Sequence, residues 1–191
     1  MPFANRILGI VTAVAADALV ALPSVAADRL ASPYQRQAAS GLRGLNENEI
    51  GDLRSGAGMG LARAAELNDY PGPRHVLDAI AAGALAATPE QTERIRHIFD
   101  RMKSDAQRLG ARILAEEHRL ETAFRTAAIT EAEVRSRVAR IAALQGDLRA
   151  VHLTAHLATR AALSEAQVAR YNELRGYASG AAVDHRHQHG H

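Results

Sequence analysis

The sequence predicts an all-α protein built on a long antiparallel helical hairpin with short flanking helices. Alanine, leucine and arginine dominate the 191 residues, and only 4% are aromatic, a composition that favours helices over sheets. From residue 88 to residue 163, apolar residues recur mostly three or four positions apart, in two runs separated by a short break. Since short connections favour antiparallel neighbours, the two runs should fold back on each other.

The first predicted arm runs from Pro89 to Ala127. Thr88 can cap it, Pro89 suits the first helical position, and the Gln91 side chain can reach back to the cap. An arm of this length extends roughly 58 Å, too far for one small globule to wrap, so much of its surface must face water, a partner or a second copy. Its apolar stripe comprises Ile95, Ile98, Met102, Ala106, Leu109, Ile113, Leu120, Phe124 and Ala127.

The second predicted arm begins at a cap formed by Thr130 and Glu133, after a turn centred near residues 128–129. With the turn there, Gly110 and Gly146 fall at nearly the same level of the opposing arms, which predicts a close approach or a bend. The second apolar stripe comprises Val134, Val138, Ile141, Leu144, Leu148, Val151, Ala155 and Ala158.

Shorter helices are expected on both sides of the hairpin. Asn46 caps the first, the glycine-rich residues 55–60 separate it from the second, and two prolines around Gly72 form a corner before the third. Helices this short are marginal alone and need a surface to pack on, which the hairpin provides. Their expected ranges are 46–54, 61–67, 75–85 and, after a cap at Ser164, 164–177, with Ser179-Gly180 ending the last.

The N-terminus has the pattern of a secretory signal peptide over residues 1–26. Arg6 precedes an apolar run over residues 7–26, and small residues stand at the expected cleavage position. Asp17 interrupts the run, which makes a membrane anchor through residues 7–26 the less favoured alternative. Residues 27–45 are expected to be a flexible linker, residues 46–178 an all-α domain, and residues 179–191 a disordered histidine-rich tail.

Two helix starts carry a family resemblance. The segments Ala87-Thr88-Pro89-Glu90-Gln91 and Leu163-Ser164-Glu165-Ala166-Gln167 resemble the paired LTxxQ motifs of the Spy/CpxP family, in the places where that family has them. Ala87 replaces the family's leucine and Ser164 its threonine, changes that keep the capping chemistry. The resemblance covers about residues 46–178.

The resemblance implies an all-α periplasmic protein that forms a cradle-like antiparallel homodimer. It implies an ATP-independent chaperone for unfolded client proteins, or an envelope-stress regulator that acts with a membrane-bound sensor. A related branch, the CnrX-like and ZraP-like heavy-metal sensors, binds metal through histidines, so a periplasmic metal sensor or accessory protein is the alternative.

His152 and His156 are the main candidate metal ligands. At positions i and i+4 they share one helix face, so both imidazoles can reach one zinc, nickel or copper ion. A third donor would come from His75, Glu66 or Met59. The alternative is two polar residues that pack at the edge of the stripe, and His97 and His118 are expected on the surface.

The tail supplies a second metal candidate in four alternating histidines. His185, His187, His189 and His191 can bind such ions loosely, but a flexible segment holds no fixed geometry. The alternative is an incidental tail without function.

Other classes of function find little support in the sequence. Leu153 occupies the glutamate position of a zinc-protease motif, and no nucleophile–base pair is evident, so we expect a protein that is not an enzyme and requires no cofactor. A formal net charge of +2, with no basic block interleaved with aromatics, argues against nucleic acid as a partner. A structural partner of a membrane sensor stays open as a third class.

Overall fold

The computed structural model describes residues 32–177, and all regular structure within them is helical. The chain divides into two units, residues 1–35 and 36–191, and all six α-helices belong to the second. The predicted signal peptide over residues 1–26 and the tail over residues 179–191 lie outside the described residues. Six α-helices follow a single 3₁₀ turn, η1 (Gln35–Gln37), which confirms the all-α fold class for the described part of the chain.

The predicted hairpin is confirmed. Helix α5 (Pro89–Arg125) and helix α6 (Glu131–Ala162) lie side by side along their length, joined by a turn over residues 126–130. Each begins with a capping box in which the threonine side chain accepts from the N3 backbone and the N3 side chain accepts from the threonine backbone. At 37 residues, α5 is about 55 Å long.

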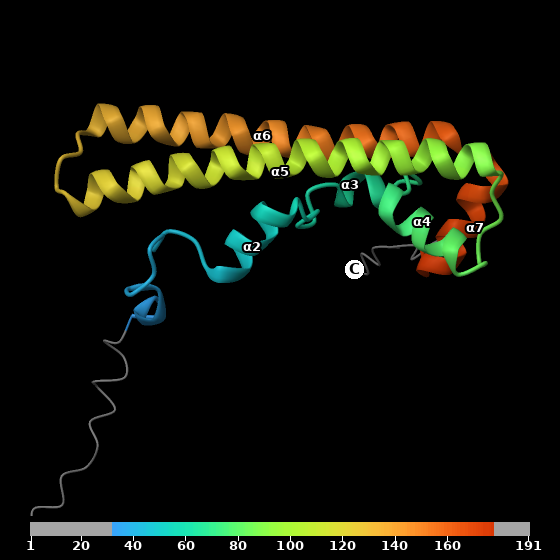
Figure 1. Cartoon of the computed structure of the whole chain (residues 1–191), viewed down its shortest axis with the longest axis horizontal. Coiled ribbons are helices and arrows are strands. Elements are labelled where there is room, and N and C mark those ends of the chain that lie inside the picture. The colour runs from blue at the N-terminus through green and yellow to red at the C-terminus, as the bar shows by residue number, and fades with distance from the viewer. Residues whose placement is uncertain (1–31, 178–191) are drawn as a thin grey trace, which may run out of the picture. The chain divides into compact units, whose positions relative to one another are not determined.

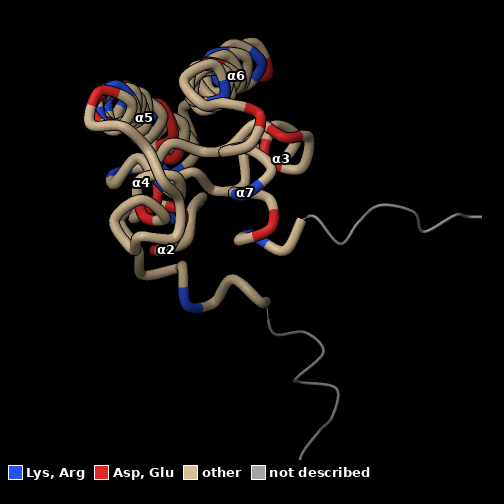
Figure 2. The backbone as a smooth tube through the Cα atoms, turned by 90° about the vertical axis from the view of Figure 1, so that its right-hand side faces the viewer, with Lys and Arg blue, Asp and Glu red and all other residues tan. Residues whose placement is uncertain are grey.

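The short helices all lie on one side of the hairpin, as two views at right angles show (Figures 1 and 2). They are α2 (Glu47–Ser55), α3 (Arg63–Glu66), α4 (Pro73–Ala81) and α7 (Glu165–Arg175). Their boundaries correct three predictions. Helix α3 is a single turn rather than a helix over 61–67; α4 begins at Pro73 and ends before Gly83; and α7 ends at the left-handed Gly176 (φ 74°), not at Ser179-Gly180.

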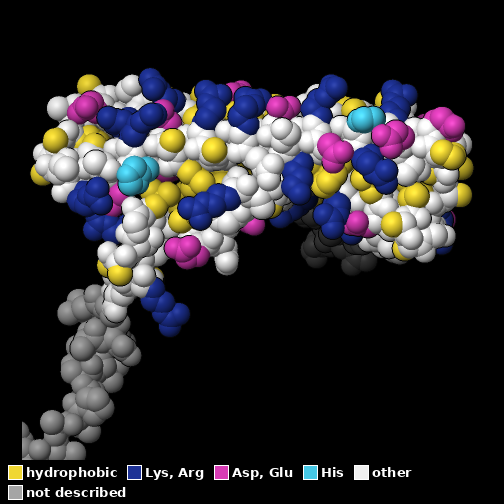
Figure 3. All heavy atoms as spheres, in the orientation of Figure 1, with side chains coloured by type: hydrophobic (Ala, Val, Ile, Leu, Met, Phe, Trp, Pro, Cys, Tyr) yellow, Lys and Arg dark blue, Asp and Glu magenta, His cyan; other side chains and the backbone are white. Residues whose placement is uncertain are grey.

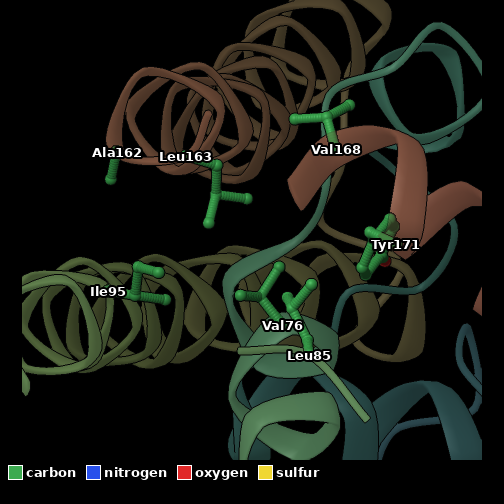
Figure 4. Packing of buried hydrophobic residues seen from close by; sticks show 7 residues of the cluster. All are labelled: Val76, Leu85, Ile95, Ala162, Leu163, Val168 and Tyr171. Atoms are coloured by element: carbon green, nitrogen blue, oxygen red, sulfur yellow. The ribbon is translucent and has the colours of Figure 1, made fainter. Parts of the chain in front are cut away.

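Two apolar clusters join this third layer to the hairpin. Near the start of α5, buried side chains from α4, α5, the end of α6 and α7 form one cluster that includes Tyr171, as Figure 4 shows. Farther along, Leu53 of α2 packs among buried residues of both arms: Ala106, Leu109, Ile113, Leu144 and Leu148. The predicted linker residues 38–45 form turns and bends, in which Arg43 pairs with Glu121 of α5 at 2.6 Å and Leu45 packs on the second cluster.

The two LTxxQ-like glutamines bind each other. The Gln91 side-chain nitrogen donates to the Gln167 oxygen at 3.0 Å, and the Gln167 nitrogen donates back at 3.1 Å. Each carboxamide oxygen also accepts from its own cap, Thr88 or Ser164, so each side chain caps its own helix and links it to the other. The pair therefore fixes the start of α7 against the start of α5.

The expected close approach at Gly110 is present, but its partner is α2 and not Gly146. A Cβ built on Gly110 would stand 2.0 Å from the Leu53 carbonyl oxygen, whereas a Cβ on Gly146 would have nothing within 4 Å. The pairing with Gly146 was therefore wrong. Because Gly110 has no side chain, α2 can lie close against α5. The turn between the arms does not determine the position of α2.

Replacing Gly110 with alanine should destabilise the protein, because the new methyl group would collide with backbone that cannot rotate away. We expect Gly110→Ala to lower the free energy of unfolding by about 1–3 kcal/mol, as overpacked cores do. Gly146→Ala is the matched control and should raise it by about 0.5–1 kcal/mol, since alanine favours an open helical site. Urea unfolding followed by circular dichroism measures both, and equal effects would contradict the packing described here.

Candidate functional site

His152 and His156 lie buried on the side of α6 that the short helices cover. His152 is 3% exposed and His156 is 9% exposed. The loop before α4 lies directly on the second ring, since a Cβ on Gly72 would stand 3.0–3.1 Å from ring atoms of His156. The predicted i, i+4 pair is thus part of the packed interior rather than a surface feature.

The backbone before α4 fixes the tautomer of His156. Its Nδ1 lies 2.7 Å from the carbonyl oxygen of Tyr70, and because a carbonyl only accepts, Nδ1 donates the proton. The other ring nitrogen, Nε2, takes no part in this contact, and a Cβ on Gly72 would stand 3.1 Å from it. A carbonyl that holds one imidazole nitrogen and leaves the second free is the usual arrangement behind a histidine ligand.

Glu66, at the end of α3, gathers several groups around its carboxylate. One oxygen accepts from the Gly72 backbone nitrogen at 3.1 Å and lies 3.6 Å from Nδ1 of His156. The other accepts from the hydroxyl of Tyr171 at 2.5 Å and from that of Tyr177 at 3.3 Å. Arg175 approaches the same oxygen at 3.5 Å.

Through these contacts, Glu66 has a structural role: it holds α7 in place. Burial, followed by the hydrogen bond to Glu66, raises the pKa of the Tyr171 phenol well above its ordinary value. Tyr171 therefore stays a neutral donor and holds its bond to the carboxylate. Sequence reasoning named Glu66 as a possible metal donor but missed the tyrosines and Arg175, which reach it from more than a hundred residues along the chain.

His152 has an unused polar atom. Its Nε2 is buried and has no hydrogen-bond partner, a situation that native interiors rarely tolerate without a reason. Burial lowers the pKa of His152, and the neighbouring His156 lowers it further. The imidazole is therefore held neutral, which is the form that binds a metal ion.

Two hollows beside α6 share three histidines. His75, at the start of α4, lines both together with His152 and His156. The first hollow, of about 420 Å³, also has Met102 of α5 on its wall; the second, of about 400 Å³, adds Met59 and Glu66. The structure thus brings every predicted donor of the described region to one place. Within residues 32–177, however, no three His, Cys, Asp or Glu side chains are already positioned to hold an ion together.

The remaining histidines either lie on the surface, as expected, or fall outside the described residues. His97 and His118 are exposed on α5, and His97 pairs with Glu93 at 3.1 Å. The tail histidines His185, His187, His189 and His191 lie outside the described residues.

A third hollow is a groove formed by α5 and α6 alone. Its volume is about 480 Å³, and every residue that lines it belongs to one of the two arms. The apolar part of its wall is Ile98, Met102, Val151, Ala155 and Ala158, and the polar part is Arg94, His97, Arg101, Asp105 and Thr154. Figure 3 shows hydrophobic side chains interspersed with charged ones along the hairpin, and large apolar residues elsewhere on it are open to solvent, with Phe124 57%, Val138 50% and Leu157 54% exposed.

Comparisons with known proteins add no identity. No family model, no curated protein and no solved structure matches this chain. Among the helices of residues 32–177, none combines the length and the apolar character needed to cross a membrane.

The lowered pKa of His152 predicts a specific pH dependence. Because the folded protein holds this imidazole neutral, the unfolded chain binds more protons between the lowered pKa and the ordinary value of 6.5. The free energy of unfolding should therefore fall as the pH drops from about 7 to about 5. His152→Gln should flatten that slope in urea unfolding series.

His118→Gln provides the control, since that residue is exposed on α5. Part of the slope should survive in His152→Gln, because burial also lowers the pKa of His75. A slope that His152→Gln leaves unchanged would show that this imidazole is not held neutral.

Proposed function

We propose that this protein is a periplasmic, ATP-independent chaperone or envelope-stress protein of the Spy/CpxP type, with no enzymatic activity. The observation that carries the proposal is the groove between α5 and α6, which has an apolar wall and a charged rim and is lined by no residue of the short helices. Apolar surface with a polar rim is what a protein uses to bind other polypeptides. The two LTxxQ-like starts and the signal-peptide pattern support the assignment.

The groove suits unfolded client segments because apolar and charged contacts of this kind do not depend on one particular client sequence. Its apolar residues can hold apolar side chains of many sequences, and Arg94, Arg101 and Asp105 supply charges of both signs at the rim. The exposed apolar residues elsewhere on the hairpin also support a homodimer, since a second copy would remove them from water.

A matched pair of substitutions on α6 tests the chaperone proposal. The protein should suppress aggregation of a chemically denatured client, followed by light scattering, at stoichiometric amounts and without ATP. Ala158→Glu places a carboxylate on the apolar wall and should require about tenfold more protein for the same suppression, equivalent to about 1.4 kcal/mol of binding. Ala143→Glu makes the same change at an exposed position of the same helix, outside the groove, and should behave like the unsubstituted chain.

Two results would remove this function or its site. An unsubstituted protein that fails to suppress aggregation at stoichiometric amounts removes the chaperone function. Equal loss in both glutamate variants removes the groove as the binding surface.

A second function, a heavy-metal-binding sensor or accessory protein, is favoured by the convergence of His75, His152 and His156 on two shared hollows. Zinc, nickel and copper all suit imidazole, and the fixed tautomer of His156 leaves Nε2 free to bind. Such a protein would pass its signal to a membrane-bound sensor.

Calorimetric titration with zinc, nickel and copper tests the metal function. The tail must be silenced first, so the starting protein is the full chain with His185, His187, His189 and His191 each changed to Gln, called here the tail-Gln protein. We expect it to retain one site per chain, and His152→Gln in that background to weaken binding by at least about tenfold. His97→Gln is the control. A tail-Gln protein that binds none of the three metals would exclude the metal function.

A further inference from the structure

The two methionines of the described residues both line the histidine hollows. The chain holds three methionines; apart from Met1, they are Met59 and Met102. Met102 lines the hollow of about 420 Å³ and Met59 that of about 400 Å³, and His152 and His156 line both. Each of the two hollows therefore combines the imidazole pair with one methionine. Sequence reasoning assigned Met102 only to the apolar stripe.

The charges around these donors discriminate between ions. Imidazole and thioether are neutral ligands, and the carboxylate of Glu66 is already engaged by the groups that hold α7. Arg74 and Lys103 line the first hollow, while Arg63 and Arg175 line the second. Repulsion by these cations scales with the charge of a bound ion, so a divalent ion meets twice the opposition that a monovalent ion meets.

The backbone at Met59 is a separate sign that its side chain is used. Its φ is +45°, in the left-handed region, within a loop whose neighbours are Gly58 and Gly60. Glycine adopts that conformation without strain and a side chain does not. Met59 is nevertheless present, 39% exposed, on the wall of the hollow that also holds the histidines.

We infer that His152 and His156, together with the thioethers of Met59 and Met102, form a site for a soft monovalent ion, Cu(I), in preference to zinc or nickel. The inference rests on the second function proposed above and names its metal. Thioether ligands select Cu(I), and imidazole completes a low-coordinate, neutral donor set. The buried Nε2 of His152, which lacks a partner, gains one in the bound ion. Side-chain rotations are required, since the two thioethers line different hollows.

Competition with a chromophoric Cu(I) chelator, in ascorbate under argon, tests the inference on the tail-Gln protein. We expect one Cu(I) per chain, and zinc and nickel affinities at least about tenfold weaker. Met59→Leu and Met102→Leu, which conserve volume and should fold, should each weaken Cu(I) about tenfold and leave zinc affinity unchanged. X-ray absorption at the copper edge should show a sulfur neighbour that is lost in the double leucine variant.

The controls separate this inference from the metal function beneath it. His97→Gln should change nothing, and circular dichroism of each variant confirms its helical content. If zinc or nickel binds the tail-Gln protein as tightly as Cu(I), or if the leucine variants keep full Cu(I) affinity, the Cu(I) site is overturned while the metal function stands. If no metal binds, both are overturned.

Discussion

A pair of long helices can bury only the seam between them, and a third layer must cover the rest of each apolar stripe. Here that layer consists of α2, α3, α4 and α7, all on one side of α5 and α6. The covered side contains both apolar clusters and the two histidines of α6. The two arms also form a groove with an apolar wall by themselves. Met102 lines both this groove and one of the histidine hollows, so the two sites adjoin at that residue.

Glu66 joins parts of the third layer through polar contacts, where the two clusters do so through apolar ones. A carboxylate that is only 12% exposed is costly unless donors surround it, and this one receives a backbone nitrogen and two tyrosine hydroxyls, with Arg175 nearby. Those groups come from the loop before α4 and from the C-terminal part of the chain. The same carboxylate lies beside His156, so the anchor of α7 and the histidine pair belong to one connected set of contacts.

Local signals made the hairpin predictable. Thr88, Thr130 and Ser164 cap helices where expected, and the turn falls at residues 126–130, because a cap and an apolar period are encoded within a few neighbouring residues. The i, i+4 spacing likewise predicted that His152 and His156 share one helix face, and both line the same two hollows. Long-range partners were not predictable in the same way. Nothing near Gly110 in sequence points to Leu53, and nothing near Glu66 points to Tyr171, because each pair meets only after the third layer has packed. The two matching caps that contain Gln91 and Gln167 were visible in the sequence. Only the structure shows that the two glutamines hydrogen-bond to each other.

The order of elements along the chain has a consequence for how the protein is made. Helices α2, α3 and α4 precede both arms of the hairpin, so during synthesis they emerge before the surface on which they rest. Helices of nine residues or fewer are marginal in water, whereas the arms pair through contacts close in sequence and can form early. Until α6 is complete, the first helices of the nascent chain therefore lack the full surface on which they pack. Helix α7, the last to appear, then meets Glu66 and closes the assembly.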